Sequence, residues 1–185
     1  MKIINYEENF FNEINTLQQS QWGEGSDTDE IFNNIENYYI KISIEENELI
    51  GVAIYHLEIN NKIIPKNEFE IIKSNFNKTK NLKSNELSCF IDFIIIKDKF
   101  QGQGIGSAFL EYIINFSKEN KCNFIECEAI EVYGIINSKK LLQKFNFEFQ
   151  DVFENYWGKK CPNFYCKQCN KKPCVCSMNK YKKFL

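Results

Sequence analysis

The chain has 185 residues, of which 43% are hydrophobic and 15% aromatic, so it can bury the core of one domain and is not a disordered protein. Its formal net charge at pH 7 is −2, which gives no general attraction to nucleic acid or to an anionic membrane. No apolar run approaches the roughly 20 residues that span a bilayer. The N-terminus also lacks the apolar segment of a signal peptide, so we expect a cytoplasmic protein that does not enter a membrane.

The first half of the chain predicts a mixture of helices and strands. Helical spacing of Phe10, Ile14 and Leu17 indicates an amphipathic helix near the N-terminus. The expected elements are a strand over 2–6, a helix over 7–19, a helix that starts near Ser26, and strands over 38–44 and 48–59. The segment 60–84 is polar and rich in Lys and Asn, with only a weak helical pattern. We expect this segment to be an insertion or a mobile flap.

The second half centres on a strand and the helix that follows it. Residues 87–96 are almost continuously apolar, which is typical of a central strand covered on both faces. Apolar residues then recur at helical spacing over 104–120. Beyond this helix, the pattern predicts a strand over 123–129, a helix over 137–144, and closing strands over 147–157 and 163–167.

A glycine-rich loop joins the apolar strand to the long helix. It reads Gln101, Gly102, Gln103, Gly104, Ile105, Gly106, Ser107. The first amides of a helix have no partner within the helix and lie at the positive end of its dipole, so such a loop can bind a phosphate. Glycines alone fit a tight turn equally well, and the spacing matches neither a Rossmann fingerprint nor a P-loop. The chain contains no arginine, so main-chain amides, lysines and side-chain amides would have to hold the anion.

This loop and its flanks resemble motif A of the GCN5-related N-acetyltransferase (GNAT) superfamily. The resemblance implies an α/β (α+β) fold with a mixed central sheet flanked by helices. It also implies acetyl-CoA as the cosubstrate. The loop residues from Gln101 to Ser107 would bind the pyrophosphate, and the main chain of a bulged strand would pair with the pantetheine arm. The remaining positions implied for coenzyme A are Ile94, Ile95, Ile96 and Asn137.

In that family an acetyl group passes directly to an amine, and a carboxylate removes the amine proton. The acceptor would be a primary amine on a small molecule, a peptide N-terminus or a lysine. Candidate bases are Asp92, Glu126 and Glu128, with Glu86 as a fourth, and each could equally be a solvated carboxylate. The single histidine, His56, is interpreted as a core or edge residue.

The helix that supplies a general acid in this family departs from the family pattern. Leu142 stands where the family usually has a tyrosine. Tyr133 is near in sequence and could donate the proton to the leaving thiolate, but a packing role is the favoured interpretation. We expect that Leu142→Tyr would not abolish transfer. The missing tyrosine also keeps open an alternative function, a non-catalytic acyl-CoA-binding module.

Five of the eight cysteines lie close together near the C-terminus, whereas Cys89, Cys122 and Cys127 are scattered through apolar segments. Four of the five form the pattern C-x2-C-x4-C-x-C and are candidate ligands of a structural Zn²⁺, and Cys161 is a spare fifth. The four are Cys166, Cys169, Cys174 and Cys176. Free or redox-active thiols are the alternative interpretation.

The sequence therefore suggests an acetyltransferase domain over 1–167 and a cysteine-rich tail over 161–185. The tail carries lysines and aromatic residues that could bind nucleic acid. A solvated and partly disordered end is the favoured interpretation. In the alternative function, this tail would recruit nucleic acid or a protein partner.

Overall fold

The structure is a computed structural model that describes residues 1–23, 28–76, 87–160, 162–163 and 165–185. In chain order the helices and strands are β1 (Lys2–Asn5), α1 (Phe11–Trp22), α2 (Thr28–Asn33), β2 (Tyr38–Glu45), β3 (Glu48–Ile59), β4 (Lys62–Ile64), α3 (Lys66–Phe76), β5 (Leu87–Ile96), α4 (Ile105–Glu119), β6 (Phe124–Glu131), α5 (Lys139–Lys144), β7 (Glu148–Phe153), α6 (Tyr156–Lys160) and β8 (Ser177–Phe184). Short 3-10 helices cover Glu8–Phe10, Ile35–Asn37 and Asp98–Phe100. Among the described helices, none is long and apolar enough to cross a bilayer.

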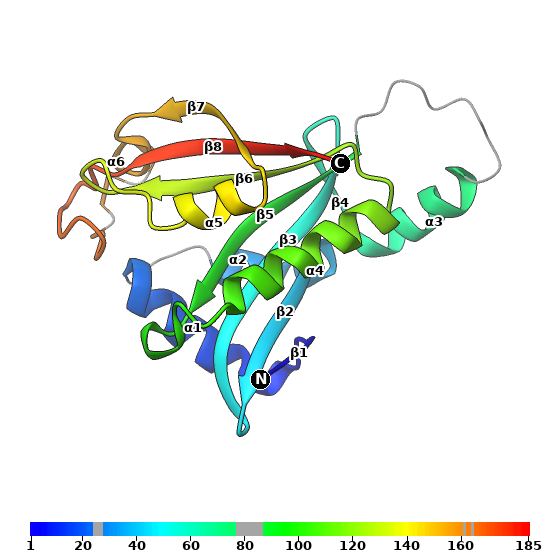
Figure 1. Ribbon diagram of the computed structural model, residues 1–185, viewed down its shortest axis with the longest axis horizontal. Coiled ribbons are helices and arrows are strands. Elements are labelled where there is room, and N and C mark those ends of the chain that lie inside the picture. Colours follow the sequence, from blue (N-terminus) through cyan, green and yellow to red (C-terminus); the bar gives the residue numbers. More distant parts are fainter. Residues whose placement is uncertain (24–27, 77–86, 161, 164) are drawn as a thin grey trace.

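The strands form one mixed sheet in the order β1-β2-β3-β5-β6-β8-β7, and β4 pairs with β3 outside this path (Figure 1). The pair β5–β6 is parallel, and helix α4 makes the crossover between these two strands. The other pairs in this order are antiparallel. This arrangement confirms the predicted mixed sheet flanked by helices.

The two faces of the sheet bury two separate apolar clusters. On one face, α4 packs through Phe109 and Ile113 onto β3, β5 and β6. On the other face, Ile14 and Leu17 of α1 pack against β2 and β3, as the helical spacing predicted. The sheet is therefore the middle layer, with the long helix that follows the glycine loop on one side and the N-terminal helices on the other.

A β-bulge at Asp92 divides strand β5 into two parts. Tyr55 pairs with Ile91 and Ile54 pairs with Phe93, so Asp92 is the extra residue. Ile91 belongs to the cluster beneath α4, whereas Phe93 belongs to the cluster beneath α1. Two residues of the same parity thus face opposite sides, because one inserted residue reverses the alternation of side chains.

The bulge coincides with the point at which β5 and β6 separate. Their parallel pairing covers Ser88–Ile91 of β5 and Phe124–Cys127 of β6 and goes no further. Beyond it, the two strands diverge to form a V that opens away from the C-terminus (Figure 1). The part of β5 after the bulge, 93–96, pairs with β3 on one edge only. Each strand edge presents main-chain N–H and C=O groups, so this free edge can pair with an extended ligand.

The C-terminal part of the chain differs from the prediction. The strand expected over 163–167 is wrong, because its described residues lie in turns and in an isolated bridge between Cys166 and Lys171. The last strand is instead β8, which lies between β6 and β7. The expected solvated end is therefore wrong for Ser177–Phe184, which pair with β6 along their whole length and with β7 over 178–182. The strand expected over 147–157 ends at Phe153 and is followed by the short helix α6.

The four cysteines of the C-x2-C-x4-C-x-C pattern thus lie in the connection between α6 and β8. Whether they make up a separate folding unit, as the division at 161–167 suggests, stays a prediction.

The segment expected to be an insertion or flap contributes to the core where it is described. Strand β4 forms a hairpin with β3, and α3 follows directly. Phe69 of α3 is only 2% exposed and lies in the cluster beneath α4. The flap interpretation therefore does not fit the hairpin or this helix, and 77–84 lie outside the described residues.

Candidate active site

The glycine loop presents main-chain amides at the start of α4. Gly102 and Gly104 have φ values of +75° and +87°, which favour glycine, and a Cβ on either would have no heavy atom within 4 Å. Side chains do not crowd the loop at these points, so a ligand can approach the backbone. Within the described residues, no backbone carbonyl accepts a hydrogen bond from the amides of 102–107. Such a loop can bind an anion, and its role toward the pyrophosphate stays a prediction.

Two further residues shape this anion site. A Cβ on Gly106 would lie 3.2 Å from Leu141 Cδ2 and 3.4 Å from Ile96 Cδ1, so glycine lets α4 pack closely on α5 and β5. Lys144 Nζ donates a 3.1 Å hydrogen bond to Ser107 Oγ. This exposed ammonium at the first turn of α4 adds positive charge where a phosphate would bind. No pattern in the sequence indicates Lys144, because only the fold brings the end of α5 to the loop.

The implied coenzyme A positions divide into two groups. Ile94, Ile95 and Ile96 lie after the bulge, on the part of β5 that has a free edge toward β6. Asn137 is exposed just before α5, and the structure shows no hydrogen bond from its side chain to a described residue. Its predicted role toward pantetheine stays a prediction.

Asp92 lies at the apex of the V and contacts His56. Asp92 Oδ2 lies 2.8 Å from His56 Nδ1, and the other ring nitrogen, Nε2, lies 3.1 Å from Glu58 Oε1. Burial opposes a charge on His56, but its hydrogen bonds and charge attraction to the two carboxylates raise its pKa to about 9. Burial also raises the pKa of Asp92, and the hydrogen bond and charge of His56 offset part of this effect. A carboxylate with a raised pKa is a better proton acceptor than an ordinary surface aspartate.

The comparisons with known proteins agree with this geometry. A family model described as the Acetyltransferase (GNAT) family matches residues 7–147 of the chain. The chain is a member of the GNAT family. It is therefore an acyltransferase. A search of curated proteins gave no match.

Several solved structures share the GNAT fold with this chain. NAA60 of Arabidopsis thaliana in complex with acetyl-CoA has a TM-score of 0.71 at 11% identity, with 100% of this chain and 98% of that chain covered. A GNAT family acetyltransferase from Elizabethkingia anophelis with acetyl-CoA bound has a TM-score of 0.64 at 16% identity, with 100% and 97% covered. The IAA acetyltransferase from Bacillus cereus has a TM-score of 0.66 at 16% identity, with 100% and 99% covered. At these identities the likeness shows the fold.

The other two candidate bases of this GNAT protein have different surroundings. Glu126 is 5% exposed and pairs with Lys182 at 2.9 Å and Lys180 at 3.2 Å, so its charge is already neutralised. Glu128 is half-buried and lies two residues further along β6, toward the open end of the V. Burial raises its pKa, and the charge of Lys160 and Lys180 lowers it in part. Glu126 is therefore engaged by two lysines, and a role of either glutamate as the base stays a prediction. Glu86 lies outside the described residues.

Tyr133 is tied to the cysteine segment. Its ring is 68% exposed, and its hydroxyl donates a 3.0 Å hydrogen bond to the carbonyl oxygen of Cys169. This geometry favours the packing interpretation, and catalysis by Tyr133 stays a prediction. Leu142, which replaces the usual family tyrosine, is buried in the core beneath α4.

The four cysteines of the C-x2-C-x4-C-x-C pattern converge on one buried point. Their Sγ atoms all lie within 4.8 Å of one another, and the pairs Cys166–Cys176 and Cys169–Cys174 are each 3.8 Å apart. Disulfide sulfurs would be about 2.0 Å apart. A tetrahedral metal with Zn–S bonds of about 2.3 Å has S···S edges of about 3.8 Å. The donor set and its spacing therefore fit a tetrahedral Zn²⁺. Cys161 lies outside the described residues.

The thiols in this cluster affect one another. Burial opposes ionisation of Cys169, but the N–H of Val175 and the neighbouring thiols lower its pKa to about 7. Burial and the adjacent sulfurs raise the pKa of Cys174 to about 11 and that of Cys176 further. Four thiolates at this separation repel one another, so full ionisation requires a cation among them.

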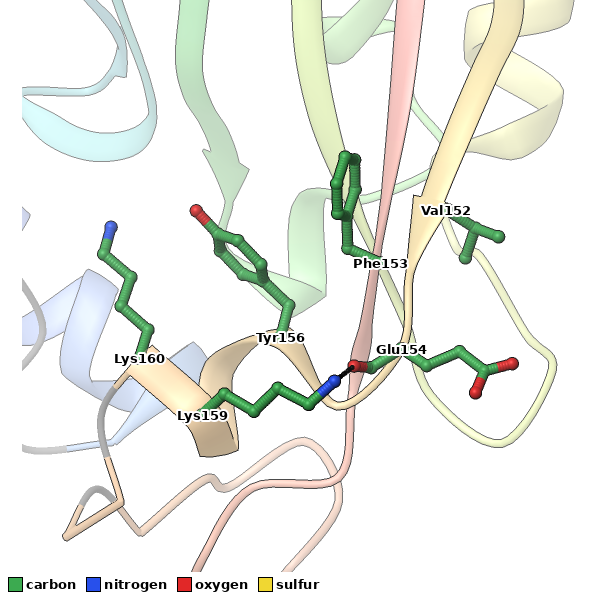
Figure 2. A pocket seen from close by; sticks show the side chains of 6 residues that line it. All are labelled: Val152, Phe153, Glu154, Tyr156, Lys159 and Lys160. Carbon is green, nitrogen blue, oxygen red and sulfur yellow. Dashed lines mark hydrogen bonds between the residues drawn. The ribbon is translucent and has the colours of Figure 1, made fainter.

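A groove lies beside α6, at the end of strand β7. It encloses about 530 Å³ and is lined by Val152, Phe153, Glu154, Tyr156, Lys159 and Lys160. Figure 2 shows the ring of Tyr156 and the side chain of Lys160 pointing away from α6 to the same side. The charge of Lys160 also lowers the pKa of Glu128 in part, so the groove and this glutamate lie in the same region of the molecule.

Proposed function

We propose that this GNAT-family enzyme transfers the acetyl group of acetyl-CoA to a primary amine. The observation that supports it most strongly is the separation of β5 from β6 beside a loop whose amides lack backbone acceptors. The solved structures with the same fold include acetyl-CoA complexes, which makes the same donor reasonable here. In this arrangement the amides of 102–107 bind the pyrophosphate, and the free edge of β5 pairs with the pantetheine arm.

The chemistry then takes place at the bulge. The amine nitrogen attacks the thioester carbonyl carbon, and the carbon–sulfur bond breaks to release the coenzyme A thiolate. Asp92 accepts the proton that the amine loses, directly or through one water, because it is the raised-pKa carboxylate at the apex of the V. His56 donates a hydrogen bond to Asp92 and holds its carboxyl group in place. A main-chain amide near Ile94 polarises the carbonyl, and the thiolate takes a proton from solvent.

The acceptor is an amine of a small molecule, a peptide N-terminus or a lysine. One of the structures that shares the fold is a complex of NAA60 with a bisubstrate analogue, and another is described as an IAA acetyltransferase. The acidic side chains near the apex, Asp92, Glu58 and Glu128, favour an acceptor that arrives as an ammonium.

We also propose that the four-cysteine cluster holds a structural Zn²⁺. The four buried sulfurs provide a closed tetrahedral set, which leaves no open position for catalysis. No disulfide joins the described cysteines, which fits the expected cytoplasmic location. A role of the segment in binding nucleic acid is less favoured, because Lys180 and Lys182 already pair with Glu126.

The test is the release of coenzyme A thiol from acetyl-CoA in the presence of an amine library that contains polyamines, amino acids and short peptides. We expect release that depends on the acceptor, together with an acetylated product of the matching mass. Tight acetyl-CoA binding without release for any amine would instead support the alternative, an acyl-CoA-binding module without turnover.

A further inference from the structure

The cysteine cluster contacts the C-terminus of α1, far away in the sequence. The N–H of Lys167 donates a 3.1 Å hydrogen bond to the carbonyl oxygen of Trp22. The side-chain amide of Gln168 donates a 2.8 Å hydrogen bond to the carbonyl oxygen of Gln21. Both donors lie between Cys166 and Cys169, so a metal bound by these two thiolates would hold this turn in shape. The last carbonyls of a helix need such donors, because the helix itself supplies none.

From α1 the contacts continue to the reaction site. The indole of Trp22 packs edge-on against the ring of Phe93, with ring centroids 5.2 Å apart. Phe93 is the residue next to Asp92, immediately after the bulge. Trp22 therefore packs on the residue that follows Asp92, on the face of β5 that α1 covers.

The cluster also supports α6 on its other side. Trp157 packs against the four cysteines. A Cβ on Gly158 would lie 2.1 Å from the carbonyl oxygen of Cys174, so only glycine permits this contact. Helix α6 carries Tyr156 and Lys160, which line the groove, and the charge of Lys160 acts on Glu128. The same four sulfurs thus position both α1 and α6.

We propose that Zn²⁺ in the cysteine cluster organises the acceptor side of the active site. Metal binding fixes the turn at 166–169 and the contact at Gly158, and these hold Trp22 and Tyr156 on either side of the opening of the V. The acetyl-CoA side depends much less on the metal. It consists of main-chain groups, the amides at the start of α4 and the free edge of β5, whereas Trp22 contacts β5 through the side chain of Phe93. Among the described residues, the glycine-loop region is linked to the end of α1 by an exposed hydrogen bond, 3.0 Å from Gln21 Nε2 to Asp98 Oδ1.

This inference rests on the proposed acetyl transfer, and it predicts separate effects on the two substrates. Purified protein should contain one Zn²⁺ per chain. Removal of the metal with a chelator should raise KM for the amine at least tenfold and change the Kd for acetyl-CoA less than threefold. Addition of Zn²⁺ alone should restore the original KM.

Two variants separate metal loss from general damage. Cys169→Ala removes one ligand, and Cys122→Ala removes a buried thiol far from the cluster as its matched control. Gln168→Ala keeps all four thiolates but removes the bond to Gln21, and Gln150→Ala in β7 is its control. We expect Cys169→Ala and Gln168→Ala to raise the amine KM, with zinc retained only in Gln168→Ala. Should Cys169→Ala not fold, chelation and Gln168→Ala still decide the question.

The chain has two tryptophans: Trp157 packs against the cluster, and the carbonyl oxygen of Trp22 accepts a hydrogen bond from the cysteine turn. Tryptophan fluorescence therefore reports on the cluster and on the end of α1 without an acceptor. In Trp157→Phe, the emission of Trp22 should shift when zinc is removed and return when it is added. Zinc-loaded enzyme that acetylates no amine would overturn the proposed function. An unchanged amine KM in metal-free enzyme, absence of bound zinc, or an unchanged Trp22 emission would overturn the inference.

Discussion

The two sides of the V are built by different means. On the coenzyme A side, a run of six neighbouring residues, 102–107, presents main-chain amides, and little depends on distant side chains. On the acceptor side, each important group is held by a partner from elsewhere in the chain: Asp92 by His56, and the end of α1 by the cysteine turn. Acetyl-CoA, the donor that the family has in common, can be bound by a local sequence motif. The acceptor amine differs between enzymes, and it would contact side chains that only the fold brings together. The predictions below test this division.

The largest effect is expected from Asp92→Asn. Asparagine keeps the size of the side chain and can still bond to His56, but it cannot accept the amine proton. We expect the rate constant for transfer, kcat, to fall about 100-fold or more, as is typical for loss of a general base, while the acetyl-CoA Kd stays the same. Steady-state kinetics and calorimetry measure the two quantities.

Two glutamate variants serve as comparisons for this result. Glu126→Gln should leave kcat nearly unchanged and lower the free energy of unfolding by roughly 1–3 kcal/mol, because two lysines lose a buried partner. Glu128→Gln should reduce kcat far less than Asp92→Asn. If Glu128→Gln gave the larger loss, Glu128 would be the base and the role assigned to Asp92 would be wrong.

The second effect concerns the coenzyme A side. Gly104→Val forces a β-branched residue into a φ of +87° and places methyl groups where the pyrophosphate would approach. We expect the acetyl-CoA affinity to fall at least tenfold, as measured by calorimetry. Gly134→Val imposes the same kind of strain at a φ of +83°, outside the loop, and should leave the affinity intact. Equal losses in both variants would show that strain, rather than the loop, controls binding.

The third effect is a pH dependence of stability that arises from His56. Its pKa is raised from 6.5 to about 9 in the folded state, so the folded protein holds this proton more tightly than the unfolded chain. The resulting stabilisation is fully present below about pH 6.5 and is lost as the pH rises through about 9. It amounts to at most about 3 kcal/mol. Denaturant unfolding at several pH values should show this decline.

The variant His56→Gln supplies the control for this pH dependence. Glutamine can bond to Asp92 but does not titrate, so the decline between pH 6.5 and 9 should become much shallower. A decline of the same size in the variant would mean that other groups, such as the buried cysteines, cause it.

The sequence predicted the coenzyme A side better than the acceptor side, for a physical reason. The strand over 87–96, the loop and the helix over 104–120 are contiguous, so periodicity and glycine spacing indicate them directly. The ion pair of His56 with Asp92 depends on the register between β3 and β5, which the bulge shifts by one residue. No local pattern reveals such a shift.

The last strand shows the same limit. Ser177–Phe184 contains four lysine and asparagine positions among its eight residues, so it reads as a polar end rather than as an inner strand. Its partners explain the composition: Lys180 and Lys182 neutralise Glu126, and Asn179 donates a hydrogen bond to Glu131. The convergence of the four cysteines agrees with their local spacing in the sequence, but their contact with α1 could not be predicted.

The smallest effect is expected from Tyr133→Phe. The variant loses only the hydroxyl, whose one hydrogen bond in the described structure goes to the carbonyl oxygen of Cys169. We expect kcat to change less than twofold and the free energy of unfolding to fall by about 0.5–1.5 kcal/mol. A general acid would behave differently, because its removal costs about 100-fold or more when the leaving group needs its proton. In the proposed reaction, the coenzyme A thiolate leaves without a proton from a general acid. A large fall in kcat with unchanged stability would therefore restore Tyr133 to the catalytic machinery and bring the cysteine segment, which holds its hydroxyl, into the chemical step.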